Sequence, residues 1–311
     1  MVQGGLAGNI AACFAAILFG ASVVATRVAV QDVPPLSLAV LRFGQGGLIL
    51  LLFIFIIGRN LLQVERRDLP FLTLLGAIFF ALFPLAFNGS LRLTEASRGA
   101  LMLATTPLWS AWLARMAKRE RLVRRQVAGI LLTLTGVGIV LAERGLTLRG
   151  TSWALAGDGL MLLTALLGAT YGVLAQRVLV RYKAVTVTTY AMVIGTLLLV
   201  PAALAEGLPQ AFVQIDGRVA MLVLFLGIFG GALGYFLWTF ALSRLTPTQV
   251  AVYVNLNPMA ATVLGAALLA ERLSEFFLIG FVTVLSGVLL VNWPRTIQRV
   301  EVIGSNSRSS I

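Results

Sequence analysis

Two prolines near the middle of apolar runs mark the places where this chain could do chemistry. Pro107 follows Thr105-Thr106, and Pro258 follows Asn255 and Asn257. Proline lacks an N–H, so the carbonyls four residues earlier should lose their helical partners. In an apolar span, such groups must be satisfied by protein or by water in a cavity. The two interruptions therefore predict either a binding site for a polar solute or kinks that the Thr and Asn side chains mend.

Aromatic residues in the neighbouring runs could wall such a site. Phe79 and Phe83 share a helical face, Tyr171 stands beside a GxxxG pair, and Tyr235 and Trp238 follow three spaced glycines. Buried Tyr and Trp need partners for their polar tips, whereas Phe and Gly can also be explained by helix packing. The candidate substrate-contacting residues are Phe79, Phe83, Asn88, Thr105, Pro107, Trp109, Tyr171, Tyr235, Trp238, Tyr253, Asn255, Asn257 and Pro258.

The residue types that most catalysis needs are missing from the same runs. The chain has no histidine, a single cysteine at position 13, and no Asp or Glu deep in an apolar run. Those absences remove the usual general bases and metal ligands, so we expect no catalytic residue, metal or cofactor and no enzyme activity. Neither lysine follows a glycine, so a Walker-type ATP-binding loop is also absent.

The composition is that of an integral membrane protein. Hydrophobic residues make up 59% of the chain, charged residues 12%, and the mean hydropathy is +0.95. A net charge of +12 suggests nucleic-acid binding in a soluble protein, but here the basic residues stand in short breaks between apolar runs. The expected partners are therefore the lipid bilayer and a small-molecule substrate, and no nucleic acid.

The apolar runs are long enough for an all-α fold of membrane-spanning helices joined by short breaks. The first run has no charged n-region, so we interpret it as a retained helix and not a cleaved signal peptide. The ten predicted spans are 8–26, 36–57, 70–89, 96–117, 126–142, 153–174, 185–205, 219–242, 248–270 and 276–293.

A repeat divides these spans into two sets of five. The segment from Pro107 to Gly136 matches the segment from Pro258 to Gly287 without a gap, including an ERL triplet and two glycines in each. Because five is odd, the second set enters the membrane from the opposite side, as in the inverted repeats of many secondary transporters. We expect repeats at 1–150 and 151–295, followed by a cytoplasmic tail at 296–311.

The basic residues predict the orientation. With the N-terminus inside, about two thirds of the 24 basic residues fall on the inner side, which the positive-inside rule favours. Both termini are therefore expected in the cytoplasm. The repeated glycines Gly129, Gly136, Gly280 and Gly287 predict close packing within each half, and the glutamates of the ERL triplets predict helix-end pairing with arginine.

The repeated P-x12-ERL-x6-G block resembles the EamA group of the drug/metabolite transporter superfamily. Size and the aromatic-rich central helices are similar to those of the YddG-type amino acid exporters in that group. The resemblance implies export of small metabolites, chiefly amino acids, across the bacterial inner membrane by alternating access. It also implies that spans one, three, four, six, eight and nine are central, with Pro107 and Pro258 as hinge or site positions.

We therefore expect an exporter of aromatic and other neutral amino acids that functions as a monomer. Without a deep carboxylate, transport is expected to run down the substrate gradient and not to be coupled to protons. The alternative is a multidrug or nucleotide-sugar carrier of the same superfamily. A nucleotide sugar would need a basic cavity, for which the candidates are Arg42, Arg98 and Arg115. A scaffold or channel subunit is a third possibility that the residues alone leave open.

Overall fold

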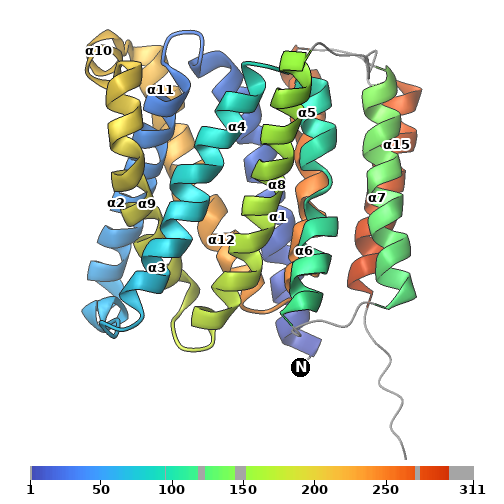
Figure 1. The fold of residues 1–311 in the computed structure, drawn as a ribbon, viewed down its shortest axis with the longest axis horizontal. Helices are drawn as coiled ribbons and strands as arrows, with labels where there is room; N and C mark the ends of the chain where they lie inside the picture. The colour runs from blue at the N-terminus through green and yellow to red at the C-terminus, as the bar shows by residue number, and fades with distance from the viewer. Residues whose placement is uncertain (1, 95, 118–122, 144–151, 270–273, 294–311) are drawn as a thin grey trace, which may run out of the picture.

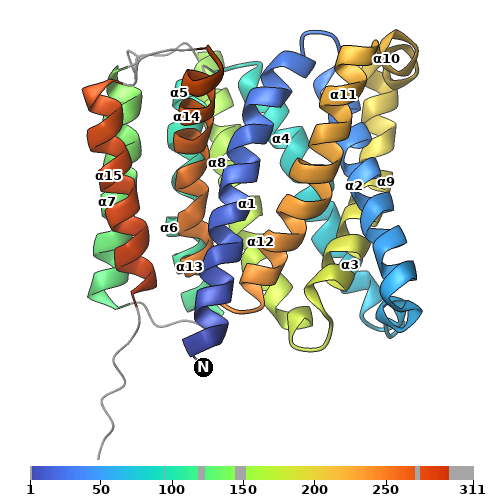
Figure 2. The same cartoon turned by 180° about the vertical axis from the view of Figure 1, so that it is seen from behind.

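The computed structural model describes residues 2–94, 96–117, 123–143, 152–269 and 274–293, and these ranges contain helices and connections without a strand. The helices stand side by side as one bundle (Figures 1 and 2). Among the described residues, eight helices are long and apolar enough to cross a membrane. The predicted all-α membrane fold is confirmed.

Each half repeats one order of helices. The first half contains α1 (Val2–Ala29), α2 (Pro35–Ile57), η1 (Arg59–Leu62), α3 (Leu69–Gly76), η2 (Ala77–Leu82), α4 (Phe83–Leu91), α5 (Ala96–Leu103), α6 (Thr106–Met116) and α7 (Arg124–Glu143). The second half contains α8 (Ser152–Leu179), α9 (Ala184–Glu206), α10 (Leu208–Gln214), α11 (Gly217–Phe225), η3 (Leu226–Leu233), α12 (Gly234–Leu242), α13 (Pro247–Ala251), η4 (Val252–Leu256), α14 (Asn257–Leu269) and α15 (Glu275–Asn292).

Two of the ten expected spans are interrupted, which is why they are absent from the eight continuous ones. The span at 96–117 is split into α5 and α6, and the span at 248–270 is split into α13, η4 and α14. The pieces of each span stand end to end in one column of the bundle (Figures 1 and 2). Both ERL triplets, 120–122 and 271–273, and the tail at 296–311 lie outside the described residues, so their expected roles stay predictions.

The two halves run in opposite directions. Figure 1 places the N-terminus of α1 at the lower end of the bundle, whereas the connection that follows α8 turns at that same end. Short motifs that the halves share also meet across them. Gly8 of α1 packs on Arg244 and Leu245, and Gly157 of α8 packs on Leu93 and Thr94. These two equivalent contacts lie at opposite ends of the bundle, as an inverted repeat requires.

The repeated glycines pack between the halves, so the prediction of packing within each half is wrong. A Cβ on Gly129 would lie 2.8 Å from the Gly287 carbonyl oxygen, and one on Gly136 would lie 2.7 Å from the Gly280 carbonyl oxygen. Helix α7 of the first half therefore pairs with α15 of the second at one edge of the bundle (Figure 1). The helix that packs closely against these glycines therefore always belongs to the other half.

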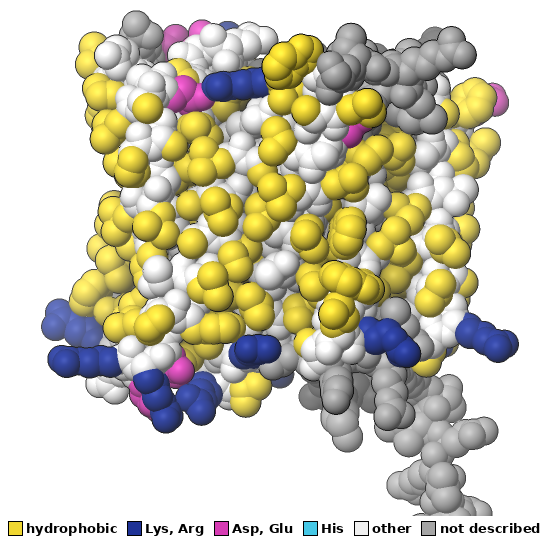
Figure 3. Space-filling view, in the orientation of Figure 1, with side chains coloured by type: hydrophobic (Ala, Val, Ile, Leu, Met, Phe, Trp, Pro, Cys, Tyr) yellow, Lys and Arg dark blue, Asp and Glu magenta, His cyan; other side chains and the backbone are white. Residues whose placement is uncertain are grey.

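Basic side chains gather at the lower rim in Figure 3, the end at which Figure 1 places the N-terminus. The described basic residues in connections or at helix ends on this side are Arg59, Arg66, Arg67, Arg115, Arg124, Arg125, Arg177, Arg181, Lys183 and Arg244. On the opposite side, Arg92 and Arg218 are the described ones whose side chains are placed. The longest expected break, near 206–218, instead folds into the short helix α10.

Candidate substrate site

Two π-helical turns, η2 and η3, occupy the middle of the third and eighth expected spans. A π-helical turn widens a helix by one residue and is common at functional sites. Helix α9 packs on η2, and helix α2 packs on η3. Each half thus supplies a widened turn against which a helix of the other half packs, and both turns lie at the level where the sequence predicts the substrate.

Rings from both halves meet between these turns. Phe79 of η2 stacks on Tyr171 of α8 with ring centroids 4.1 Å apart, and Tyr235 of α12 contacts Phe79 at 5.4 Å. Phe80 and Phe43 extend the group, each within 5.5 Å of Tyr235. These five residues, here called the central aromatic cluster, are all less than a tenth exposed. The structure therefore brings together three of the predicted site residues, Phe79, Tyr171 and Tyr235.

Two further predicted residues adjoin this cluster. Phe83 contacts Phe79 with centroids 5.2 Å apart. Trp238 is linked through Phe19 of α1, whose ring lies 6.0 Å from Trp238 and 4.9 Å from Tyr235. The polar tip of Tyr171 is satisfied, because its hydroxyl lies 3.1 Å from the Thr239 hydroxyl. The cluster is thus bounded by α1, α2, α8 and α12 as well as by η2.

The first interruption is a helix break whose backbone is repaired by hydroxyls. Pro107 lies in the first turn of α6, where its missing N–H is not needed. The Thr106 hydroxyl donates to the Leu103 carbonyl at 2.5 Å, and the Thr105 hydroxyl donates to Met102 at 2.6 Å. The carbonyl that the sequence leaves free is therefore satisfied locally, as the mending explanation predicts.

The second interruption leaves its amides unused. Pro258 is the second residue of α14, and the Val254 carbonyl accepts the Asn257 backbone N–H. Asn255 is 1% exposed, yet neither atom of its side-chain amide has a hydrogen-bond partner among the described residues, and the Asn257 side-chain oxygen has none either. Buried polar groups are normally paired, so these amides at a helix break are candidates for a ligand.

This second break touches the helix that carries Phe19. A Cβ on Gly20 would lie 2.8 Å from the Asn257 carbonyl oxygen, so α1 passes directly against the start of α14. Another predicted residue in the break, Tyr253, is 6% exposed and donates its hydroxyl to Asn9 of α1 at 3.0 Å. Helix α1 therefore connects the break with the central aromatic cluster.

Two predicted residues stay apart from the cluster. The Trp109 indole N–H donates to the Thr105 hydroxyl at 3.2 Å, and its ring contacts Trp112, with no described ring contact to the cluster. Asn88 is partly exposed on α4, nine residues beyond Phe79. Whether either contacts substrate stays a prediction.

Arg42 also lies in this region, although the sequence predicts it only as a candidate for a basic cavity and not among the substrate-contacting residues. It lies in the first half of α2, about 10 Å along the helix from its first residue. Its guanidinium carbon lies 5.1 Å from the Phe43 ring centre and 5.8 Å from that of Tyr235. Arg115 is exposed at the end of α6, and the Arg98 side chain is not among those described. A signal was available, since Arg42 is a charge well inside an apolar run.

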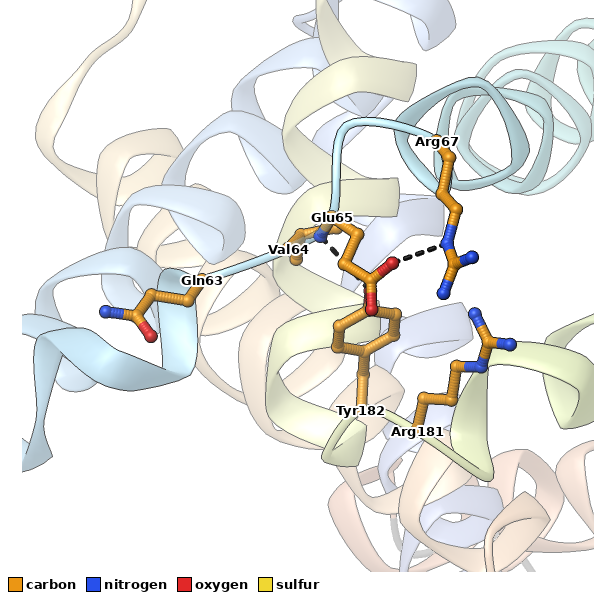
Figure 4. A pocket seen from close by; sticks show the side chains of 6 residues that line it. All are labelled: Gln63, Val64, Glu65, Arg67, Arg181 and Tyr182. Atoms are coloured by element: carbon orange, nitrogen blue, oxygen red, sulfur yellow. Dashed lines mark hydrogen bonds and ion pairs between the residues drawn. The ribbon is translucent and has the colours of Figure 1, made fainter.

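A polar pocket of about 660 Å³ lies at the lower rim, lined by Gln63, Val64, Glu65, Arg67, Arg181 and Tyr182. Figure 4 shows the loop after α2 meeting the loop after α8, so the pocket joins the halves. Two of the lining residues also bind Asp68: the Tyr182 hydroxyl donates to its carboxylate at 2.7 Å, and Arg181 donates a longer bond at 3.3 Å. The bond from Tyr182 lowers the pKa of Asp68 and raises that of Tyr182.

Carboxylates are scarce inside the bundle. Asp158 is the buried acidic residue in the described part of the chain, near the start of α8, and it accepts the Thr94 hydroxyl at 2.7 Å. The described residues contain no group of three or more Asp, Glu, Cys or His side chains that could hold a metal ion. The site is therefore made of rings, amides, hydroxyls and one guanidinium, which suits binding better than bond cleavage.

A model of the EamA-like transporter family matches the chain twice, over residues 6–142 and 155–293. The two matches fall on the two repeats. A solved structure, described only as a crystal structure of a protein, shares the fold with a TM-score of 0.77 at 19% identity, covering 93% of this chain and 96% of that one.

Several curated relatives carry transporter names. A probable amino-acid metabolite efflux pump of Salmonella typhimurium is 28% identical over 88% of this chain and 91% of its own length. A probable terminal-alkyne amino-acid exporter of Streptantibioticus cattleyicolor is 27% identical over 76% of both chains. The transporter YyaM of Bacillus subtilis, of uncharacterised activity, is 28% identical over 88% of this chain and 89% of its own.

Proposed function

Because this chain belongs to the EamA-like transporter family, and is a multi-pass membrane transporter and not an enzyme, we propose that it exports aromatic and other neutral amino acids. The observation that carries the proposal is the central aromatic cluster, built from both halves at the level of the two π-helical turns. Two relatives named as amino-acid exporters or efflux pumps support the substrate class.

Rings suit the apolar side chain of such a substrate. Phe79, Phe80 and Tyr235 meet edge to face or tilted, so a ring inserted among them would find both faces and edges at contact distance. The unpaired amide of Asn255 and the unpaired side-chain oxygen of Asn257 offer a donor and acceptors for polar groups of the substrate. The arrangement thus provides for an amphipathic molecule with one aromatic or aliphatic end.

Alternating access would use the equivalent contacts at the two ends of the bundle. Gly8 against Leu245 closes one end, and Gly157 against Thr94 closes the other. If one contact opens while the other stays closed, the same central site faces each side of the membrane in turn. The end that carries the basic rim is proposed to face the cytoplasm, together with both termini, in a bacterial inner membrane.

Transport is proposed to run down the substrate gradient. A proton-coupled carrier needs a titratable group that changes its protonation during the cycle. Asp158, the buried carboxylate of the described region, is already bonded to Thr94 near one end of the bundle and lies away from the central rings. Flux that follows an imposed pH gradient in proteoliposomes would contradict this part of the proposal.

The test is a counterflow screen of the purified protein in proteoliposomes. Vesicles loaded with one unlabelled compound are given the same labelled compound outside, and accumulation reports exchange without a driving ion. We expect accumulation of L-phenylalanine, L-tryptophan and L-leucine, and none of a nucleotide sugar. Accumulation of cationic drugs or nucleotide sugars, with no amino acid accepted, would favour the alternative carrier type. A C-terminal reporter with an external signal would overturn the orientation.

A further inference from the structure

We propose that Arg42 binds the carboxylate group of the transported amino acid. This inference rests on the proposed function and names the chemistry that orients the substrate in its site. Arg42 lies in the wall of the central aromatic cluster, where a carboxylate bound to the guanidinium would leave the substrate side chain among the rings.

The position of Arg42 is costly unless it has a use. Charged side chains within membrane spans are rare, and those that occur pair with other groups or line a transport pathway. No described carboxylate forms an ion pair with Arg42. By contrast, Arg92 and Arg181 are paired with Glu206 and Asp68 at the ends of the bundle.

Most of the guanidinium donors are not used by the described protein. One terminal nitrogen of Arg42 donates to the Gly230 carbonyl oxygen at 3.1 Å, and the buried Nε has no partner. A guanidinium carries five N–H donors in a planar fork that matches the two oxygens of a carboxylate. The side chain also remains partly exposed, so it is not sealed by its neighbours.

The surroundings hold this donor fork toward the rings. Phe43 and Tyr235 lie against the guanidinium, and cation–π contacts of this kind stabilise a desolvated cation. On the other side, glycines of η3 leave the room that Arg42 occupies: a Cβ on Gly230 would lie 2.2 Å from the Ser22 hydroxyl and 3.4 Å from a terminal nitrogen of Arg42.

The pseudo-symmetric helix has no such cation. Helices α2 and α9 both contain 23 residues, and counting from the first residue of each places Arg42 opposite Ala191. The Arg42 carbonyl oxygen lies against Gly231 of η3, and the Ala191 carbonyl oxygen lies against Gly76, the residue directly before η2. A single cation on one side of a paired scaffold gives a zwitterionic substrate one preferred orientation.

A purely structural role is the competing explanation. The bond to Gly230 could serve only to satisfy a carbonyl of the π-helical turn. If that were the only role of Arg42, its replacement would lower the affinity for every substrate by the same factor. Carboxylate binding instead predicts that the replacement lowers the affinity only for substrates with a carboxylate. The two explanations therefore predict different changes in substrate selectivity.

The experiment compares L-phenylalanine with L-phenylalaninol, which keeps the ammonium group and the ring but has a hydroxymethyl group in place of the carboxylate. Affinity of each is measured by competition against labelled L-leucine counterflow in proteoliposomes with the membrane potential clamped at zero. The wild type should prefer the acid by about 10- to 100-fold, the range expected for hydrogen bonds to a charged partner. The Arg42→Gln variant should show a ratio near one.

Two further variants keep the inference falsifiable. Arg42→Lys retains the charge without the fork and should keep an intermediate preference. Arg59→Gln removes an exposed cation that stacks on Phe55 at the end of the same helix, and it should keep the wild-type ratio. If Arg42→Gln does not fold, the wild-type and Arg42→Lys ratios decide the matter.

Three results would overturn the inference. An unchanged ratio in Arg42→Gln, or an equal loss for both compounds, would assign Arg42 a structural role while leaving amino-acid transport intact. Equal affinity of the wild type for L-phenylalanine and L-phenylalaninol would also show that Arg42 does not bind the carboxylate. A wild type that accepts no amino acid would overturn the proposed function together with this inference.

Discussion

The two π-helical turns lie in corresponding spans of the two halves, but one contributes aromatic side chains to the centre and the other contributes glycines. The turn η2 has the sequence AIFFAL, with Phe79 and Phe80 and no glycine, whereas η3 has the sequence LGIFGGAL, with three glycines at 227, 230 and 231. In the first half the turn supplies rings to the central aromatic cluster. In the second half it supplies empty space, which Arg42 and Ser22 fill from neighbouring helices.

This difference distinguishes the backbone features that the halves share from the side chains that could determine specificity. The backbone pattern of broken and widened helices is shared by both halves, as a rocking-bundle transporter requires. The residues that could select a substrate are those that depart from the repeat, namely the rings on one side and the single guanidinium on the other. The proposed substrate, with an apolar end and a charged end, would lie between these two different walls.

The largest effect is expected from giving η3 the side chain of η2. In Gly231→Phe the added Cβ atom would lie 3.0 Å from the Arg42 carbonyl oxygen, and this backbone atom cannot move aside as the end of a flexible side chain would. Overpacking typically costs about 1–3 kcal/mol, and a whole ring against backbone should exceed that. We expect no monodisperse peak in detergent size-exclusion chromatography. Gly138→Phe, at a glycine with open space around it, is the control that should fold.

A second variant weakens the aromatic wall without emptying it. Phe79→Leu removes the ring that stacks on Tyr171 while keeping an apolar side chain of similar size. Aromatic pairs add about 0.5–1.5 kcal/mol beyond area burial, so affinity for L-phenylalanine should fall about two- to tenfold relative to L-leucine in competition counterflow. The matched control is Phe277→Leu, a buried stacked ring on α15. An equal change of this relative affinity in both variants would show that the central aromatic cluster does not select the substrate.

The two helix breaks offer a comparison of the same kind. In the first, the Thr106 hydroxyl satisfies a backbone carbonyl, so Thr106→Ala should lower stability by about 1 kcal/mol with little change in transport. In the second, Asn255 has no partner, so Asn255→Ala should leave the melting temperature unchanged or higher while transport falls about tenfold. Thermal unfolding and counterflow of both variants decide this; a stable, fully active Asn255→Ala would remove Asn255 from the site.

The smallest effect is expected at the lower rim, outside the site. Asp68 has a lowered pKa, so its contribution to stability is present above the ordinary aspartate pKa near 4 and is lost as the pH falls through the lowered value. The melting temperature of Asp68→Asn should therefore lie below that of the wild type by a constant amount from pH 8 to about pH 5. The difference should shrink below about pH 4. A difference that grows on acidification would show that Asp68 is not stabilised by Tyr182.

Much of this architecture follows from the sequence. Hydropathy placed the expected spans within a few residues, and the repeat placed Pro107 and Pro258 at the two breaks. The sequence does not indicate the π-helical turns, because apolar runs such as AIFFAL have no local feature that marks a widened turn. The sequence predicts the wrong half for the partners of Gly129 and Gly136, because a repeat shows which residues correspond but not which ones are in contact.

The arrangement of the candidate site could be predicted from the sequence only in part, for a related reason. Tyr171, Tyr235 and Phe79 could be named because buried aromatic residues at helical spacing are visible in one chain. Their contact with one another, and the position of Arg42 beside them, depend on how α2, η3 and α12 pack. Long-range packing of this kind leaves no trace in the spacing of a single sequence.

Substrate protection of a single cysteine tests the central claim most directly. Cys13 is the native cysteine of this chain, so Phe83→Cys in a Cys13→Ser background puts the reporter thiol next to Phe79. We expect L-phenylalanine to slow maleimide labelling of this thiol several-fold, with no effect on a thiol at Gly217, which has open space at the far end of the bundle. If L-phenylalanine is transported but both thiols react at unchanged rates, the substrate does not bind at the central aromatic cluster.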